Sequence, residues 1–299
     1  MVHVPTTTRF IKAGGLRFEV TECGDGQQLA LCLHGFPENS FSWRHQLPFL
    51  ASLGYRAWAP NLRGYGQSSR PVEISKYHIE RLVEDVEGLI DAAGTTSVLL
   101  VGHDWGGEIA WMTALKQRVH LSGLVIINAP HPAIFASRIF SWPQIRRSWY
   151  MLAFQIPKLP EYWLGRQSAR AIGSAFVDMA ADKTCFSKDV LDVYRQQALI
   201  PGALRAMVNY YRANVTFLWN ARATLNNLIE IPTLLIWGEQ DTALGVDLTF
   251  GTHQLVPQLT TCYLPNVSHW AQQEAPGEVN KAIETWLATH GAQLGSHPR

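Results

Sequence analysis

Short apolar runs with the character of buried β-strands alternate along most of this chain with segments that have the period of amphipathic helices. In one such segment apolar residues recur at helical spacing from Ile79 to Ile90, charged residues take the other face, and Gly94 is placed to end the helix. Repeated strand–helix–strand units predict a mostly parallel, doubly wound sheet with helices on both faces. The strand-like runs behind this prediction are LALCLHG, YRAWAP, SVLLV, LSGLVIINAP, PTLLIWGEQD and TTCYLPNVSHW.

The alternation is interrupted once, by a helical and aromatic stretch that contains no clear strand. We therefore expect an α/β core formed by residues 1–132 and 224–299, with residues 133–223 inserted between its two parts as a helical cap. Ahead of the first parallel strand, Gly14 and Gly15 separate the runs RFIKA and LRFEVTE, which predicts a β-hairpin.

The composition restricts the classes of function. Hydrophobic residues make up 47% of the 299 residues and charged residues 16%, which is typical of a compact enzyme. A formal net charge of +1 with scattered basic residues argues against a nucleic-acid partner. We find no apolar stretch suited to a signal peptide or a membrane span, so we expect a cytoplasmic protein. The four cysteines lie far apart without metal-binding spacing, so we expect free thiols and no metal site.

Polar motifs follow four of the predicted strands. Because the carboxyl ends of parallel strands form the crevice of a doubly wound sheet, these motifs are expected to meet there. They contribute a carboxylate at Asp104, a second carboxylate at Asp241 and a histidine at His269, in an order found in hydrolases. The motifs are HGFP at 34–37, HDWGG at 103–107, GEQD at 238–241 and NVSHW at 266–270.

Asp104 has two possible roles. An aspartate at the start of a helix is commonly an N-cap. However, Gly102, Gly106 and Gly107 surround it in the frame where a serine hydrolase has its nucleophile, and they permit the tight strand-to-helix turn that exposes such a side chain. We favour the nucleophile.

The chain resembles the epoxide hydrolases of the α/β-hydrolase fold over nearly its whole length, in HGFPENSFSWR, RGYGQSS, GHDWGG, WGEQD and SHW. The resemblance implies an α/β-hydrolase fold with an inserted helical cap and no metal or organic cofactor. It assigns Asp104 as the nucleophile, His269 as the base and Asp241 as the acid that orients the base. Glu239 is the alternative acid. Some members place this acid after an earlier strand, where this chain has Asn128.

The resemblance also implies an oxyanion hole formed by the backbone N–H groups of Phe36 and Trp105. A cis peptide bond is expected before Pro37. We expect the substrate pocket to be lined by Phe36, Trp105, Phe154 and His103.

A carboxylate nucleophile suits a saturated carbon that bears a leaving group, because attack then gives an alkyl ester. Water activated by His269 would hydrolyse this ester on Asp104. An epoxide oxygen, unlike a halide, needs a proton, and a tyrosine remains protonated near neutral pH. Two cap segments, SWYMLAFQ and NYYRAN, resemble the tyrosine regions of epoxide hydrolase caps and select Tyr150 and Tyr211, with Tyr210 pointing elsewhere.

We therefore predict hydrolysis of a small hydrophobic epoxide to a vicinal diol, with water as the second substrate, by a monomer or homodimer. A haloalkane or haloacid dehalogenase of the same fold is the alternative, since the indole N–H of Trp105 could hold a halide. Against it, Phe36 stands where haloalkane dehalogenases usually have a polar asparagine. A noncatalytic binding protein of this fold would be expected to lose part of the catalytic triad, and all three positions are kept here.

Overall fold

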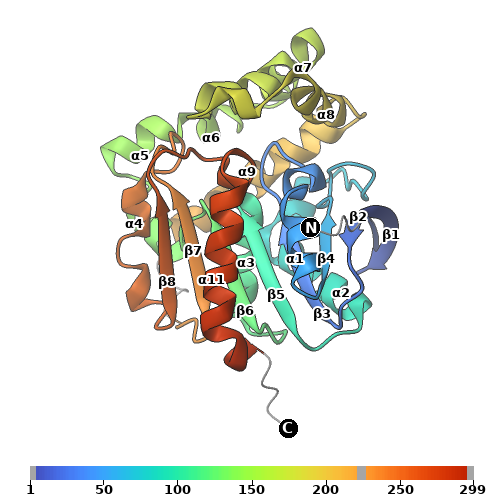
Figure 1. Ribbon diagram of the computed structural model, residues 1–299. Helices are drawn as coiled ribbons and strands as arrows, with labels where there is room; N and C mark the ends of the chain where they lie inside the picture. Colours follow the sequence, from blue (N-terminus) through green and yellow to red (C-terminus); the bar gives the residue numbers. More distant parts are fainter. Residues whose placement is uncertain (1–4, 221–226, 295–299) are drawn as a thin grey trace.

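The computed structural model describes residues 5–220 and 227–294. It contains one eight-stranded sheet with helices on both faces and a further layer of helices above it (Figure 1). The predicted mostly parallel sheet is confirmed. The strands are β1 (Thr7–Ala13), β2 (Leu16–Cys23), β3 (Gln28–Leu33), β4 (Tyr55–Pro60), β5 (Val98–His103), β6 (Gly123–Ile127), β7 (Thr233–Gly238) and β8 (Leu259–Leu264).

The first two strands form the predicted antiparallel hairpin, in which Ala13 pairs with Leu16. Gly14 and Gly15 both have positive φ, 55° and 78°, the backbone conformation that a tight two-residue turn requires and that glycine adopts without strain. β2 then pairs antiparallel with β4, and all later pairings are parallel.

The strand order is β1-β2-β4-β3-β5-β6-β7-β8. The chain passes from β3 outward to β4 and then returns to the other side of β3 to form β5. Ligands of doubly wound sheets bind at the carboxyl ends of the strands where the order reverses in this way. The loops that follow β3 and β5 carry HGFP and HDWGG, so the fold brings these two motifs together.

Both faces of the sheet are covered by helices because the strand residues are apolar on both sides. Leu100 packs with the helices of one face, whereas its neighbours Leu99 and Val101 pack with those of the other. Gly94, with φ of 64°, ends α2 as predicted. The covering helices are α2 (Ile79–Ala93) and α3 (Trp105–Lys116) on the first face, and α1 (Gln46–Ser52) and α11 (Pro276–Leu294) on the second.

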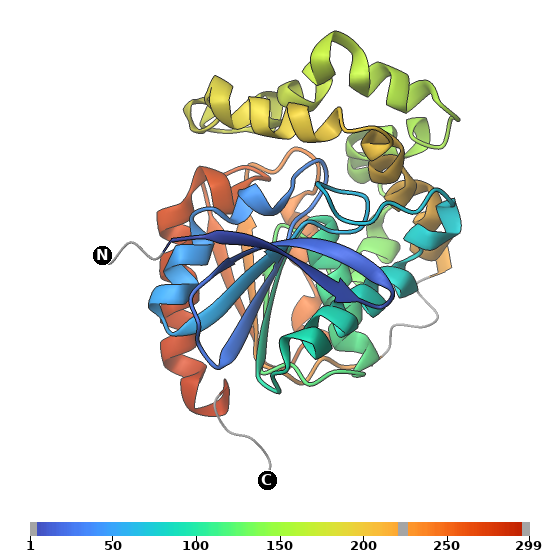
Figure 2. The same cartoon turned by 90° about the vertical axis from the view of Figure 1, so that its right-hand side faces the viewer.

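Between β6 and β7 the described chain forms helices and no strand through residue 220, and most of them lie as a layer over the sheet (Figure 2). This is the region that the sequence assigns to the cap. The predicted boundary between residues 223 and 224 lies outside the described residues. The helices are α4 (Pro132–Arg138), α5 (Trp142–Arg147), α6 (Trp149–Ala153), α7 (Leu159–Met179), α8 (Lys188–Ala198) and α9 (Ala203–Asn220).

The remaining short elements lie in the connections between these strands and helices. They are η1 (Ser40–Trp43), η2 (Ile74–Tyr77), η3 (Lys183–Cys185), η5 (Val246–Thr249), η6 (Thr252–Gln254) and α10 (Ala271–Glu274). The four cysteines all lie within the described residues and form no disulfide. In the part of the chain that the structure describes, no helix combines the length and apolarity needed to cross a bilayer.

Candidate active site

Asp104 lies on the turn between β5 and α3, with φ of 50° and ψ of −121°. Positive φ is uncommon for an aspartate and indicates a sharp, strained turn. Its side chain makes no capping hydrogen bond to α3, so the N-cap alternative does not describe it. A Cβ atom on Gly106 would lie 2.0 Å from the carbonyl oxygen of Leu33, so the close packing of this turn against β3 requires a glycine. The turn therefore presents the Asp104 carboxylate to the crevice.

The HGFP loop holds one oxygen of that carboxylate. The backbone N–H of Phe36 donates to Asp104 Oδ1 at 2.7 Å. A Cβ atom on Gly35 would lie 2.4 Å from the same oxygen, so the loop can approach this closely only with glycine. The Phe36–Pro37 peptide bond is cis, as expected. His34 lies behind the loop, where its Nε2 accepts a hydrogen bond from the backbone N–H of Leu62 at 3.1 Å.

The second carboxylate oxygen faces the histidine. Asp104 Oδ2 lies 3.6 Å from His269 Nε2, a separation longer than a hydrogen bond. On the opposite side of the ring, His269 Nδ1 donates to Asp241 Oδ2 at 2.7 Å. The three residues therefore form a line in which the ring stands between two carboxylates, with Nε2 directed toward the candidate nucleophile.

Three groups besides the histidine ring hold the Asp241 carboxylate. Its Oδ1 accepts from the backbone N–H groups of Ala243 and Leu244, both at 2.8 Å. Its Oδ2 accepts from Asn128 Nδ2 at 2.8 Å, and Asn128 Oδ1 in turn accepts from the Gly238 backbone N–H at 3.0 Å. Asn128, at the end of β6, is thus a support for the acid at the end of β7. Glu239, the alternative acid, is exposed.

The two carboxylates control the protonation of the ring between them. Burial disfavours the charged form of His269, but the negative charges of Asp241 and Asp104 outweigh this effect and raise its pKa to about 10. Burial acts to raise the pKa of Asp104, but the neighbouring His269 outweighs it and the pKa is lowered. In the unreacted enzyme at neutral pH, Asp104 is therefore a carboxylate and His269 an imidazolium.

A buried polar cluster behind the site was missed in the sequence. Glu38 is fully buried, and its Oε1 accepts from the side-chain amides of Gln272 and Gln273 at 2.9 and 2.7 Å. Its Oε2 lies 2.7 Å from His103 Nδ1. His103 Nε2 lies 2.8 Å from the carbonyl oxygen of His269. This cluster joins the segment after the HGFP loop to the end of β5, just before Asp104, and to the segment that carries His269.

The expectation that His103 lines the substrate pocket is wrong. The side chain is fully buried, and both ring nitrogens face the oxygen acceptors just described. It therefore supports the backbone of the candidate base from behind. The adjacent HGFPE segment offered one signal, a glutamate beside a loop motif, but the side chains that bind this glutamate are more than 60 residues away in the chain.

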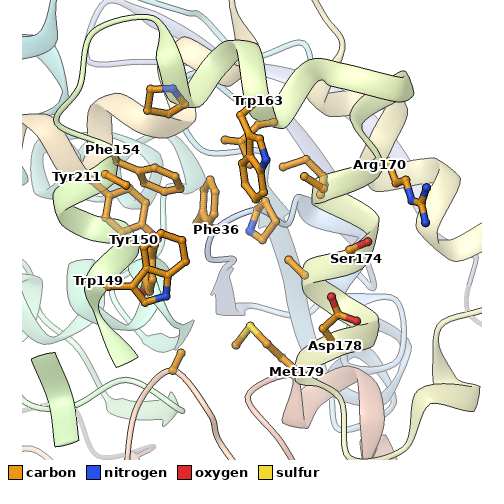
Figure 3. Close-up of a pocket in the computed structure, with 18 of the residues that line it drawn as sticks. Phe36, Trp149, Tyr150, Phe154, Trp163, Arg170, Ser174, Asp178, Met179 and Tyr211 are labelled. Carbon is orange, nitrogen blue, oxygen red and sulfur yellow. The ribbon is translucent and has the colours of Figure 1, made fainter. Parts of the chain in front are cut away.

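A large cavity of about 840 Å³ opens over Asp104 and His269. Tyr150 and Tyr211 reach it from the cap and lie with Phe154 near Phe36 in Figure 3. Arg170, Ser174 and Asp178 of α7 line the other side of the cavity, and Trp149 lies beside Tyr150 (Figure 3). Asp104 thus faces a mainly aromatic wall, with polar residues of one helix along its other side.

The cap tyrosines are held by aromatic rings. The Tyr211 ring contacts those of Phe36, Phe154 and Trp105 edge-on, with centroids 5.3, 5.0 and 5.2 Å away. Tyr150 lies 5.8 Å from Tyr211 by the same measure. Burial raises the pKa of both hydroxyls above the ordinary value, so both are protonated at neutral pH.

Tyr210 lines neither cavity, as expected: its ring contacts that of Trp105, with centroids 5.7 Å apart, and its hydroxyl donates to the carbonyl oxygen of Arg63 at 2.9 Å. Trp105 does not line the large cavity. Its side chain lines a second, smaller cavity of about 60 Å³, which Asp104, Tyr150 and Tyr211 share with the first. The Trp105 backbone N–H stays a predicted second donor of the oxyanion hole. Across residues 5–220 and 227–294, no group of three or more histidine, cysteine, aspartate or glutamate side chains is arranged to hold a metal ion.

Comparison with known proteins agrees with this geometry. The model of the alpha/beta hydrolase fold family matches residues 30–276. Epoxide hydrolase 3 from Xenopus tropicalis is 37% identical over 93% of this chain and 76% of its own length. Epoxide hydrolase 4 from Homo sapiens is 36% identical over 93% of this chain and 77% of its own length.

Solved structures give the same result. An epoxide hydrolase from Bacillus megaterium, determined with an inhibitor, is 29% identical and superposes with a TM-score of 0.87 over 94% of this chain and all of its own. One from Vigna radiata is 28% identical and superposes with a TM-score of 0.83 over 95% of this chain and 98% of its own. By sequence and by structure, the chain belongs to the epoxide hydrolases of the alpha/beta hydrolase fold family.

Proposed function

We propose that this enzyme hydrolyses hydrophobic epoxides to vicinal diols through a covalent ester on Asp104. One observation carries the proposal: Asp104 has one oxygen held by the Phe36 N–H and the other 3.6 Å from His269 Nε2, at the floor of a cavity that two tyrosines enter from the cap. A nucleophile and two candidate acids therefore face the same space from opposite sides.

In the first step, Asp104 Oδ2 attacks an epoxide carbon and the ring C–O bond breaks. The electron pair of that bond goes to the epoxide oxygen, which takes a proton from the hydroxyl of Tyr150 or Tyr211. The other tyrosine stabilises the developing charge by a hydrogen bond. The product is a hydroxyalkyl ester, and Asp104 Oδ1 becomes its carbonyl oxygen.

In the second step, water attacks the carboxyl carbon of the ester and gives a proton to His269 Nε2. The Phe36 N–H already contacts Oδ1 and is placed to stabilise the oxyanion that forms there, with the Trp105 N–H as the second donor. The ester C–O bond breaks, and the diol oxygen takes the proton from the imidazolium. The remaining proton of the water, now on Asp104, passes to His269, which restores the Asp104 carboxylate and the imidazolium.

The charges of the triad separate the two steps. His269 is an imidazolium while both neighbouring carboxylates are charged. Esterification makes Asp104 neutral, which removes one of the charges that raise the histidine pKa, so that pKa falls. His269 then gives up the extra proton of the imidazolium, which restores the hydroxyl of the tyrosine that protonated the epoxide oxygen, so the histidine becomes a base only after the ester has formed. Asp241 keeps the ring oriented throughout through the 2.7 Å hydrogen bond.

The large cavity is suited to an apolar substrate, because Phe36, Phe154, Trp149 and Trp163 all line it. All residues proposed for both steps come from one chain, so either a monomer or a homodimer can perform them. The enzyme needs no metal or organic cofactor for this scheme, since every proton and electron pair is supplied by side chains, epoxide or water.

The experiment that tests the proposal is a side-by-side assay of styrene oxide and 1-chlorobutane, with diol and halide both measured. We expect diol from the epoxide and little halide from the haloalkane, because the tyrosines supply a proton that only the epoxide needs. Efficient halide release with no diol would instead establish the dehalogenase alternative.

A single turnover in heavy-oxygen water tests the covalent route. The first diol released should carry an unlabelled enzyme oxygen, and the label should enter the peptide that contains Asp104. Label found in that first diol would mean that water attacks the epoxide directly.

A further inference from the structure

Glu108 is a buried carboxyl group that the proposed reaction does not use. It lies in the first turn of α3, four residues after the nucleophile, and its backbone N–H donates to the Asp104 carbonyl oxygen at 2.9 Å. The side chain is 9% exposed, and no described residue makes a hydrogen bond to its buried Oε1. Buried polar atoms normally have a partner, and leaving one unpaired costs about 1–3 kcal/mol.

The carboxyl group lines the smaller cavity of about 60 Å³. Asp104, Tyr150 and Tyr211 line both this cavity and the larger one, so the two spaces adjoin at the reacting atoms. A water molecule takes about 30 Å³ in the liquid, so the smaller space holds only a few non-hydrogen atoms. The remainder of its wall is apolar and includes Ala129, Phe135, Met151 and Leu244.

Glu108 can both donate and accept a hydrogen bond in this position. Burial raises its pKa to about 8, and the nearby charge of Asp104 acts in the same direction. The group is therefore largely a neutral carboxylic acid at neutral pH, with one O–H donor and acceptor oxygens. A hydroxyl group has the same combination of one donor and acceptor lone pairs.

We propose that the smaller cavity is a subsite for a short, hydroxyl-bearing substituent of the epoxide, which hydrogen-bonds to Glu108 while an apolar substituent occupies the larger cavity. The substrate class is then an epoxide with a hydroxymethyl group on one ring carbon and a bulky apolar group on the other. This inference rests on the proposed function, since it concerns the substrate of the same site.

Other small substituents fit less well. A methyl group would occupy part of the space and leave the Glu108 carboxyl unpaired. An ammonium group would have to lose its hydration inside an apolar wall, opposite a group that is largely neutral. A hydroxymethyl group matches the volume and pairs the carboxyl group.

The test uses two epoxides that differ only at this substituent, trans-3-phenyloxirane-2-methanol and trans-2-methyl-3-phenyloxirane. The measured quantity is the ratio of their kcat/KM values, hydroxymethyl over methyl, in the parent, Glu108→Gln and Glu108→Met. We expect the ratio to fall about tenfold in Glu108→Met, the loss of one hydrogen bond between buried groups. Glu108→Gln keeps a donor and an acceptor and should retain most of the ratio.

Comparing ratios cancels the intrinsic reactivity of the two epoxides and any general loss of activity in a variant. Glu87→Met, which removes a carboxyl on α2 outside both cavities, is the control and should leave the ratio at its parent value. A parent-like ratio in Glu108→Met would overturn the subsite. A parent enzyme that opens neither epoxide would instead count against the proposed function.

Discussion

The core half and the cap half of the site hold their functional groups by different means. In the core, Asp104, Asp241 and His269 are positioned by short hydrogen bonds from backbone and buried side chains at the ends of β5, β7 and β8. In the cap, Tyr150 and Tyr211 are held mainly by edge-on ring contacts. Hydrogen bonds are strongly directional, whereas ring contacts tolerate a range of angles and distances.

The elements that carry the two tyrosines also differ from each other. Tyr211 lies within the long helix α9, where its side chain is buried. Tyr150 lies in α6, which spans only five residues and has no buried residue. We therefore expect a division of roles, in which the core positions Asp104 and His269 and the cap determines which epoxides reach them. The following predictions test this division, beginning with the core.

The largest effect is expected at the nucleophile. Asp104→Ala should reduce turnover by roughly 10⁴-fold or more, as removal of a nucleophile does in other hydrolases. Mass spectrometry of the intact variant after incubation with epoxide should show no added substrate mass. Circular dichroism should match the parent, because the elbow glycines and the Phe36 loop are unchanged. A variant that still gains substrate mass would place the nucleophile elsewhere.

His269→Gln separates the two steps. Alkylation needs only Asp104 and a tyrosine, so the variant should still form the ester but release diol about 10³-fold more slowly or worse. The protein should become heavier by one substrate, with the adduct on the peptide that contains Asp104. If the variant binds epoxide yet never gains this mass, the histidine takes part in the first step and the proposed division is wrong.

The acid can be tested by exchanging it with its neighbour. Asp241→Asn should slow ester hydrolysis by roughly 10²-fold to 10⁴-fold, because the imidazolium loses its carboxylate partner. Adding Asn128→Asp places a carboxylate at residue 128, whose side chain lies 2.8 Å from that of Asp241 in the parent, so part of the rate of ester hydrolysis should recover. The measurement is the single-turnover rate of ester breakdown. No recovery in a folded double variant would show that direct contact with the ring is essential.

The cap tyrosines should have smaller individual effects. Tyr150→Phe or Tyr211→Phe should slow ester formation by roughly 10- to 100-fold, since a hydrogen bond to developing charge contributes about 1.5–3 kcal/mol. The double variant should lose nearly all ester formation. Stopped-flow measurement of the first step gives these rates.

Tyr210→Phe is the matched control for damage to α9. It removes the hydrogen bond to the Arg63 carbonyl, so the melting temperature should fall while the rate of ester formation changes little. A double Tyr150/Tyr211 variant that still opens epoxides at close to the parent rate would remove the acid role from both residues.

The smallest effect lies where core and cap meet. Burial raises the pKa of Glu108 from 4.5 to about 8, so between these pH values the folded protein keeps a proton that the unfolded protein releases. The free energy of unfolding of the parent therefore falls as the pH rises through this window. Glu108→Gln lacks this dependence. The melting temperature of the variant, relative to the parent, should therefore rise from pH 5 to pH 8. A constant difference across this range would mean that Glu108 is ionised throughout.

Much of the site could be predicted from local patterns. The strand-like runs and glycine turns place Asp104, Asp241 and His269 at strand ends, and strand ends of a parallel sheet converge. The failures share one cause. His103 adjoins Asp104 in sequence, yet its two ring nitrogens contact the Glu38 carboxylate and the backbone carbonyl of His269, which is 166 residues away. No local pattern reveals which way such a side chain turns.

The sequence by itself determined the fold class, because strand and helix periods and turn residues are local properties, and its motifs named the candidate triad through their resemblance to epoxide hydrolases. Only the tertiary structure decided that Asn128 supports Asp241, that Glu38 and His103 brace the base, and that Glu108 lines a small cavity beside the nucleophile. These facts depend on contacts between distant segments. Burial, hydrogen-bond partners and cavity shape arise when those segments pack, so they are set by the whole fold.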